Sequence, residues 1–264
     1  MKSKDTKIKN RTGKKIFCRV DGIIPERRSP AVLIVHGFSG NSNERHIAAI
    51  SDSLATAGFL TLRVDLTKNP GKSYLNFSEV TYAQELSDLE DVFDYLLQIP
   101  NVNPTRIGIA GHSLGGLLVA ELTAKRKEIK SAILLSAVYD PRIMLDKIFK
   151  KPVAEFMEDF KKRGWTERWS PTLNKNLKIR LKFYVDIATR TAGNFVQNIT
   201  SPTLIILGGS DDSVSQEHAD NYLKFISSKV RKMEIIAGAD HIYSGKALDK
   251  VAKLVADWFA ETLS

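Results

Sequence analysis

The sequence has very little cysteine: Cys18 is the single one among 264 residues. One cysteine excludes an intrachain disulfide framework, and it also excludes the paired cysteines that structural zinc sites need. Because Cys18 falls in a strand-like stretch, we expect it to be a small packing residue and not a nucleophile. We expect no metal ion and no cofactor.

Long apolar runs are also missing. No run approaches the roughly 18 residues that a helix needs to cross a bilayer, and no apolar segment follows the basic residues at the start as a signal peptide would require. We therefore expect a cytoplasmic protein without a membrane partner. Internal repeats and low-complexity segments are absent as well.

Negative charge is scarce in two segments. The formal net charge is +9, and residues 1–30 hold ten Lys/Arg against three acidic residues, while residues 140–198 hold thirteen against seven. No aromatic–basic recognition motif accompanies these segments, so they indicate solvated faces, and we expect no nucleic-acid partner. Attraction of anionic substrates or products is the weaker alternative. The sequence leaves the oligomeric state open.

What the chain does have is a regular alternation of apolar runs and helical patterns. It predicts strands at 14–20, 31–35, 59–64, 106–110, 131–137, 202–207 and 232–236, and helices at about 44–57, 79–99, 117–124, 216–227 and 244–261. Ser78 is the expected cap of the second helix. Such alternation predicts an α/β fold with a mostly parallel sheet covered on both faces. Because 264 residues can form one such unit, we expect residues 1–264 to be a single domain.

The alternation breaks between residues 140 and 198. This segment is helical in character but irregular, with interruptions at Pro141, Pro152 and Pro171. It holds eight of the 22 aromatic residues: Phe149, Phe156, Phe160, Trp165, Trp169, Phe183, Tyr184 and Phe195. We expect a helical lid over the sheet, with some rings packed onto the body and others lining a pocket. The sequence does not identify which residues of this segment contact a substrate.

The most informative stretch is GHSLGG at 111–116, which joins an apolar strand to a helical segment. Its Gly-x-Ser-x-Gly pattern, centred on Ser113, is typical of a nucleophile elbow. The sharp turn strains the serine backbone, so the residues two positions away, Gly111 and Gly115, must be small. The hydroxyl then projects above the sheet, and N–H groups at the helix N-terminus face developing negative charge. A glycine-rich helix start capped by a serine is the plainer alternative.

A serine hydroxyl needs a base, a group that orients the base, and oxyanion donors before it can attack a carbonyl. Asp211 and His241 each follow a predicted buried strand, so they supply a carboxylate and an imidazole. The order Ser113, Asp211, His241 is the order that the α/β-hydrolase fold uses. Asp212 is the alternative candidate for the acid. We favour Asp211 because it lies three residues before Val214, the spacing found in α/β-hydrolases. Asp140 is a second alternative, in which the acid would follow an earlier strand of the sheet.

Other polar residues near the strand ends have plainer expected roles. We expect His36 and His112 to orient loops by hydrogen bonding. His46 and His218 lie on predicted helices, where a surface or capping role is expected. We expect Asp240 to be solvated.

With these motifs, the chain resembles the α/β-hydrolase superfamily over nearly its whole length. Within it, the chain is similar to compact bacterial cinnamoyl/feruloyl esterases and related carboxylesterases. The matching pieces are HGFSGN at 36–41, the elbow, the acid loop at 208–214, the loop that carries His241 and the insertion before the acid. One departure is DLTKNPG at 65–71, which stands where relatives often have a glycine-rich loop. This difference affects the pocket wall beneath Tyr74 and Asn76.

The resemblance implies a serine ester hydrolase that forms an acyl-enzyme on small acyl or aryl esters of the hydroxycinnamoyl type. In it, Ser113 would attack the carbonyl, His241 would transfer the proton, and Asp211 would hold the imidazole. The backbone N–H groups of Phe38 and Leu114 would form the oxyanion hole, each contributing about 3 kcal/mol. The alternatives are an oligopeptidase-like serine peptidase, a thioesterase and, in another class, a catalytically silent binding protein.

Overall fold

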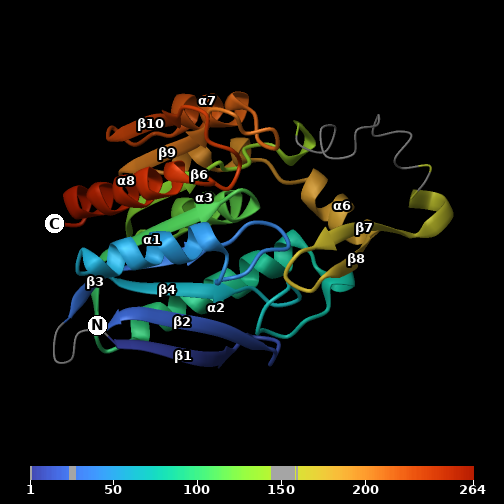
Figure 1. The fold of residues 1–264 in the computed structure, drawn as a ribbon, viewed down its shortest axis with the longest axis horizontal. Coiled ribbons are helices and arrows are strands. Elements are labelled where there is room, and N and C mark those ends of the chain that lie inside the picture. The colour runs from blue at the N-terminus through green and yellow to red at the C-terminus, as the bar shows by residue number, and fades with distance from the viewer. Residues whose placement is uncertain (1, 24–27, 144–157, 159) are drawn as a thin grey trace.

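The structure is a computed structural model that describes residues 2–23, 28–143, 158 and 160–264. Its main sheet has eight strands in the order β1-β2-β4-β3-β5-β6-β9-β10 (Figure 1). The strands are β1 (Lys2–Lys9), β2 (Lys15–Ile23), β3 (Ser29–Val35), β4 (Leu60–Asp65), β5 (Val102–His112), β6 (Ile129–Leu135), β9 (Thr203–Gly208) and β10 (Arg231–Ile236). The helices packed on it are α1 (Arg45–Thr56), α2 (Tyr82–Gln98), α3 (Leu114–Lys125), α7 (Gln216–Phe225) and α8 (Lys246–Thr262).

Strands β4, β3, β5, β6, β9 and β10 pair in parallel, whereas β1–β2 and β2–β4 are antiparallel. All parallel strands therefore end at the same edge of the sheet. In sheets of this kind, ligands bind at that carboxyl edge. The predicted mostly parallel sheet is confirmed.

The hydrophobic core has two layers, one on each face of the sheet. In β3, Val32 and Ile34 belong to the layer under α1 and α8, while Leu33 and Val35 belong to the layer under α2, α3 and α7. Figure 1 shows these helices on opposite faces. Successive strand residues point to opposite faces, so a strand covered on both sides must be apolar throughout. This is why the continuous apolar run at 31–35 predicted a central strand correctly.

Two predictions for the body were wrong. The first strand is β1, which the sequence analysis missed because it is polar and mostly exposed, with lysines at alternate positions along much of it. Lysine-rich edge strands resist pairing with other chains, so an edge strand needs no apolar face. The second helix begins at Tyr82, capped by Thr81, whose side chain accepts a hydrogen bond from Gln84 N at 3.2 Å. Ser78 instead lies in a short 3₁₀ helix, η1 (Phe77–Glu79).

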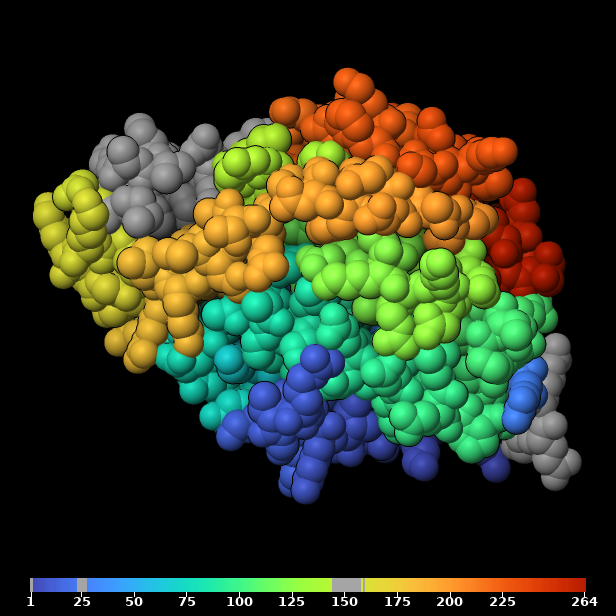
Figure 2. Space-filling view, turned by 180° about the vertical axis from the view of Figure 1, so that it is seen from behind, coloured from blue at the N-terminus to red at the C-terminus, as the bar shows by residue number. Residues whose placement is uncertain are grey.

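The insertion at 140–198 is not helical throughout. It contains an antiparallel hairpin of β7 (Trp165–Ser170) and β8 (Lys175–Arg180), followed by α6 (Leu181–Ala188), η2 (Ala192–Asn194) and η3 (Val196–Asn198). The helical prediction was wrong for the hairpin because its two strands are short and mostly polar, and the alternation of Leu177 and Ile179 in β8 spans only two apolar residues. In Figure 2 the yellow segment around β7 projects at one end of the molecule. Phe149, Pro152 and Phe156 lie outside the described residues.

The described part of the insertion packs against loops at the carboxyl edge of the sheet. The rings of Phe183 and Phe38 stack with centroids 4.4 Å apart. Thr172 Oγ1 accepts a hydrogen bond from Asn41 Nδ2 at 3.0 Å. The insertion therefore lies beside the loop that follows β3, while its action as a lid stays a prediction.

None of the helices in the described ranges is long and apolar enough to span a membrane.

Candidate active site

Ser113 lies in the sharp turn between β5 and α3. Its backbone has φ 55° and ψ −120°, a conformation that side chains rarely adopt. Its N–H donates to the carbonyl of Leu135 at 2.9 Å, which ties the turn to β6. A Cβ on Gly111 would lie 2.3 Å from the carbonyl oxygen of Gly115, and one on Gly115 would lie 2.2 Å from that of His36. Small residues are therefore required on both sides of the serine, as the sequence predicted.

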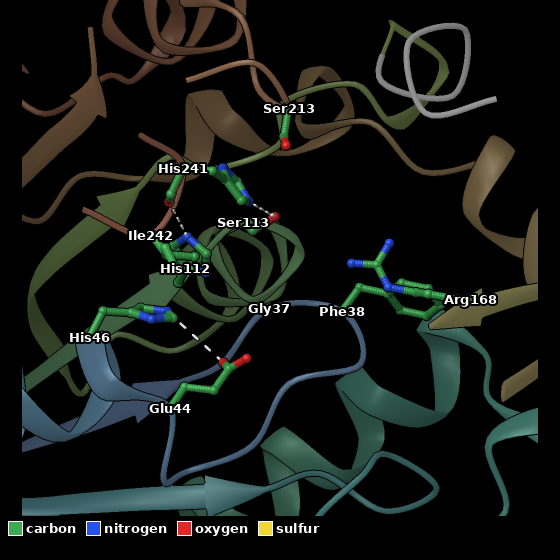
Figure 3. A pocket seen from close by; sticks show the side chains of 10 residues that line it. All are labelled: Gly37, Phe38, Glu44, His46, His112, Ser113, Arg168, Ser213, His241 and Ile242. Atoms are coloured by element: carbon green, nitrogen blue, oxygen red, sulfur yellow. Dashed lines mark hydrogen bonds and ion pairs between the residues drawn. The ribbon is translucent and has the colours of Figure 1, made fainter. Parts of the chain in front are cut away.

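The structure brings Ser113, Asp211 and His241 into one hydrogen-bonded row. The Nδ1–H group of His241 donates to Asp211 Oδ2 at 2.8 Å, and Nε2 of the same ring lies 3.1 Å from Ser113 Oγ. Figure 3 shows the ring of His241 directed at the hydroxyl of Ser113. With Nδ1 protonated, Nε2 has a free lone pair that can accept the serine proton.

The Asp211 carboxylate is held in its ionised form by its surroundings. The side chain is only 1% exposed, and its Oδ1 accepts the N–H groups of Ser213 and Val214, both at 2.9 Å. Burial acts to raise the pKa of Asp211, but the hydrogen bond and charge of His241 and the N–H of Val214 outweigh it, so the pKa lies below its usual value. The base is therefore oriented by a charged partner at neutral pH.

Neither rival acid contacts His241. Asp212 is exposed, and its Oδ1 accepts a hydrogen bond from Ser213 Oγ at 3.1 Å. Asp140 instead pairs with Arg142, whose Nε lies 2.9 Å from Asp140 Oδ1. Within the described chain, Asp211 is the carboxylate that reaches the imidazole.

Two other histidines orient loops, as predicted. His36 donates through Nδ1 to the carbonyl of Gly37 at 2.7 Å and accepts the N–H of Leu66 at Nε2, at 3.2 Å. His112 donates through Nε2 to the carbonyl of His241 at 2.8 Å. They therefore fix the loops that follow β3 and β10.

The prediction of surface or capping roles for His46 and His218 was wrong, because both lie on the inner faces of their helices. His218 is buried, and its Nδ1 accepts the N–H of Tyr139 at 2.9 Å. His46 is buried against His112, with ring centroids 4.4 Å apart. Asp240, by contrast, is exposed as predicted.

A buried network behind Asp211 went unrecognised in the sequence. The hydroxyl of Tyr243 shares its proton between Ser136 Oγ, at 2.9 Å, and the carbonyl oxygen of Ile206, at 3.1 Å, which leaves the Ser136 proton for Asp211. The hydroxyl of Ser136 in turn hydrogen-bonds Asp211 and helps to lower its pKa. Ser136 and Tyr243 both have positive φ, 41° and 58°. Strained residues of this kind cluster at functional sites, but no sequence pattern identifies them.

The two predicted oxyanion residues lie in the loop after β3 and at the start of α3. Leu114 is the first residue of α3, so its N–H has no partner within the helix and points along the positive end of the helix dipole. Phe38 follows β3 and lines the same pocket as Ser113. Their action on an oxyanion stays a prediction.

The pocket at Ser113 encloses about 630 Å³, including its open mouth. It is lined by Gly37, Phe38, Glu44, His46, His112, Ser113, Arg168, Ser213, His241 and Ile242 (Figure 3). None of the described rings of the insertion is part of the lining of this pocket, so the prediction that some of them line a pocket stays a prediction. Phe160, Phe183 and Tyr184 are buried in the core instead, and the described insertion contributes Arg168 to the lining. The only signal for Arg168 in the sequence was the basic character of the segment.

Three ionisable groups that line the pocket beside Ser113 have shifted pKa values. Burial lowers the pKa of His46 to about 4, assisted by the positive charge of His241, and burial brings the pKa of His112 well below its usual value. Burial raises the pKa of Glu44 to about 7, although the N–H of Asn41 and the charge of Arg168 oppose the rise. His46 and His112 are therefore neutral at pH 7, and neither is hydrogen-bonded to Ser113 Oγ, whereas His241 is.

The described residues include no cluster of three His, Cys, Asp or Glu that could hold a metal ion. Cys18 is fully buried, and burial raises the pKa of its thiol. Its predicted packing role is confirmed.

Known proteins resemble this chain in sequence and in fold. The family model described as "Serine aminopeptidase, S33" matches residues 26–244. Esterase EstD from Thermotoga maritima is 24% identical over 225 residues, a match that covers 76% of this chain but 51% of EstD, so the chain spans about half the length of EstD.

Solved structures resemble this chain over its full length. Est1E from Butyrivibrio proteoclasticus, with ferulic acid bound, has a TM-score of 0.82 at 28% identity, with 98% of this chain and 99% of Est1E covered. The α/β hydrolase GrgF from Penicillium has a TM-score of 0.79 at 17% identity, covering 100% and 99%. These likenesses confirm the α/β-hydrolase fold.

Proposed function

The chain belongs to the serine aminopeptidase S33 family, and from this membership and the site geometry we propose that it is a serine carboxylic ester hydrolase. The observation that carries the proposal is the contact of His241 with both Asp211 and Ser113, at 2.8 and 3.1 Å. A hydroxyl, a neutral imidazole and a buried carboxylate in this order form a complete proton-transfer unit.

In the first half of the reaction, Ser113 Oγ attacks the ester carbonyl while Nε2 of His241 takes the serine proton. Asp211 stabilises the imidazolium that forms. The carbonyl oxygen becomes an oxyanion, which accepts hydrogen bonds from the N–H groups of Phe38 and Leu114, each contributing about 3 kcal/mol to the transition state. The imidazolium then protonates the leaving alcohol, and the acyl group remains on Ser113.

In the second half, water replaces the alcohol. His241 takes a proton from the water as it attacks the acyl carbonyl, and the same oxyanion donors are used again. The tetrahedral intermediate collapses, the proton returns to Ser113 Oγ, and the carboxylic acid leaves. No oxidant, metal or cofactor takes part in either half.

We further propose that the acyl part of the substrate is small or aromatic, of the hydroxycinnamoyl type. The site is a small concave pocket beside Ser113, which favours a small acyl or aromatic group over the long chains of glycerides. The ring of Phe38 gives one wall an aromatic surface. The likeness to Est1E, which binds ferulic acid, supports an aromatic acid as the product.

Loss of the nucleophile tests the enzyme class. We expect a fluorophosphonate to label wild-type protein at Ser113 and Ser113→Ala to lose both labelling and esterase activity, with a loss of at least 10³-fold in kcat. Ser227→Ala, which removes an exposed serine after α7, is the matched control. Near-native activity in Ser113→Ala would end the proposal, and failure of the folded wild type to be labelled would favour a silent binding protein.

A substrate panel tests the acyl preference. We expect hydroxycinnamate methyl esters and short p-nitrophenyl esters to have higher kcat/KM values than acyl-CoA, peptide amides or acyl chains beyond about twelve carbons. Because all of these substrates use the same acyl-enzyme chemistry, the ranking separates an esterase from a thioesterase or a peptidase. Best turnover of acyl-CoA or of an amide would reject the ester assignment while leaving the roles of the three residues intact.

A further inference from the structure

Arg168 is held at the pocket by two contacts with the body of the protein. Its Nε donates to Ser39 Oγ at 2.8 Å, and its guanidinium carbon lies 5.4 Å from the centroid of the Phe38 ring. Figure 3 shows the guanidinium extending from β7 over Phe38, with its terminal nitrogens directed into the pocket. The side chain therefore presents a fixed pair of N–H groups in the cavity that contains Ser113.

Arg168 forms no direct ion pair with a carboxylate of the described residues. Three other cations of the insertion do form such pairs: Arg180 and Lys182 with Glu79, and Arg190 with Asp186. Glu44, the carboxyl group in the same pocket lining, interacts with it at longer range.

We propose that Arg168 selects esters that carry a carboxylate, which it binds through its terminal nitrogens while Ser113 attacks the ester carbonyl. The proposal deepens the proposed ester hydrolase activity and rests on it. A guanidinium with its Nε already hydrogen-bonded keeps two parallel N–H donors free, which match the two oxygens of a carboxylate. Arg168 is exposed at the edge of the pocket, so a substrate carboxylate can reach its terminal nitrogens from solvent, and the Phe38 ring supports the guanidinium from one side.

The same geometry predicts which kinetic constant changes. The carboxylate of such an ester takes no part in the bond changes, so its contact with Arg168 is equally strong in the bound substrate and in the transition state. Binding energy of this uniform kind lowers KM and leaves kcat largely unchanged. The preference for the charged ester should therefore appear mainly in KM, and it should weaken as ionic strength rises.

Two pairs of esters test the proposal, one for each side of the scissile bond. On the acyl side, mono-4-nitrophenyl glutarate is compared with its methyl ester, methyl 4-nitrophenyl glutarate. On the alcohol side, 4-butyryloxybenzoate is compared with methyl 4-butyryloxybenzoate. Within each pair, one ester has a free carboxylate and the other has the same group as an uncharged methyl ester. The ratio of their kcat/KM values therefore measures recognition of the charge. The pair with the larger ratio identifies the side on which the carboxylate lies.

We expect wild type to favour the charged member of one pair by about tenfold or more. Arg168→Gln should reduce that ratio at least tenfold. Arg168→Lys should give an intermediate ratio, because a lysine keeps the positive charge but cannot bind both carboxylate oxygens with parallel N–H groups. Lys178→Gln is the control: it removes an exposed cation from β8 of the same hairpin, which lies over Trp165 and outside the pocket lining. It should leave the ratio within about twofold.

Failure of this inference is distinguishable from failure of the proposed function. If wild type hydrolyses the uncharged esters but shows no preference in either pair, or if Arg168→Gln leaves the ratio unchanged, the role of Arg168 is rejected and the esterase stands. If wild type hydrolyses none of the four esters, or if Ser113→Ala hydrolyses them equally well, the proposed function is rejected as well.

Discussion

The two walls of the pocket differ in how completely their polar groups are bonded within the chain. On the wall that carries Ser113, the imidazole of His241 has partners at both nitrogens, and Asp211 accepts bonds at both oxygens. On the opposite wall, His46 Nε2 is buried without a hydrogen-bond partner in the described chain, and Arg168 forms no ion pair there. We call Ser113, Asp211 and His241 the first wall, which is hydrogen-bonded within the chain, and Glu44, His46 and Arg168 the second wall, which has unused donors and acceptors.

This difference separates the chemistry from the recognition of substrate. Groups that transfer a proton must already be oriented before the substrate arrives, so their hydrogen bonds are made within the protein. Groups that recognise a substrate must have unused donors and acceptors, since a buried polar group without a partner gains most from a ligand that supplies one. We therefore expect substitutions on the first wall to lower kcat and substitutions on the second wall to change substrate preference.

The largest effect expected on the first wall comes from Asp211. Asp211→Asn should lower kcat by roughly 10²–10⁴-fold, because a neutral amide neither stabilises the imidazolium nor keeps Nδ1 protonated. Asp212→Asn is the matched control, since Asp212 is exposed and bonds Ser213, and it should keep kcat within about twofold. The check is steady-state kinetics on one p-nitrophenyl ester. A reversed ranking would make Asp212 the acid.

A smaller effect on the same wall is expected from Tyr243, which positions Ser136 behind Asp211. Tyr243→Phe should lower kcat by about two- to tenfold with little change in KM, because Ser136 loses the hydroxyl that holds it. Tyr82→Phe is the control: it removes another buried, hydrogen-bonded tyrosine hydroxyl, whose partner is Glu121. Each variant should lose about 1 kcal/mol of stability in urea unfolding.

Equal losses of kcat in Tyr243→Phe and Tyr82→Phe would mean that the hydroxyl of Tyr243 acts through stability alone. A change confined to Tyr243→Phe would identify it as a positioning residue. The pH dependence of stability adds a second measurement: weaker hydrogen bonding to Asp211 raises its pKa toward the ordinary value, so the stability that the ionised carboxylate contributes should be smaller in Tyr243→Phe and should be lost at a higher pH on acidification.

Sequence patterns predicted the first wall well because its geometry follows from local rules. An apolar strand followed by Gly-x-Ser-x-Gly and a helix fixes where Ser113 lies, and parallel strands bring Asp211 and His241 to the same edge of the sheet. The same rules predicted the strands from β3 onward in the body. They failed at β1, which has no apolar face, because an edge strand is defined by its neighbour β2 and not by its own pattern.

The second wall could not be predicted, because its members meet only through tertiary packing. Glu44 precedes α1 and Arg168 lies on β7, so 124 positions separate two residues that line one pocket. The hairpin that carries Arg168 has a polar sequence, and its register depends on its packing against the body. The sequence predicts a surface position for His46, and only the packing of α1 on the sheet buries it. No local pattern encodes these juxtapositions.

The smallest expected effect, at Glu44, measures the charge balance of the second wall. Burial raises the pKa of Glu44 to about 7, against the N–H of Asn41 and the charges of Arg168 and His241, while Asp65 adds to the rise. Its neighbour His46, whose Nε2 lies 4.0 Å from Glu44 Oε2, is neutral at this pH. Below pH 7 the carboxyl is therefore protonated and leaves the charge of Arg168 uncompensated. Above pH 7 the carboxylate offsets that charge and repels an anionic ester.

The ratio of kcat/KM for mono-4-nitrophenyl glutarate over its methyl ester should accordingly fall by about threefold as the pH rises from 6 to 8.5. In Glu44→Gln the ratio should stay at its low-pH value throughout, because the amide carries no charge. Glu217→Gln, at an exposed position on α7, should keep the wild-type fall. A fall that persists in Glu44→Gln would assign the titration to another group, and the second wall would then owe its selectivity to Arg168 alone.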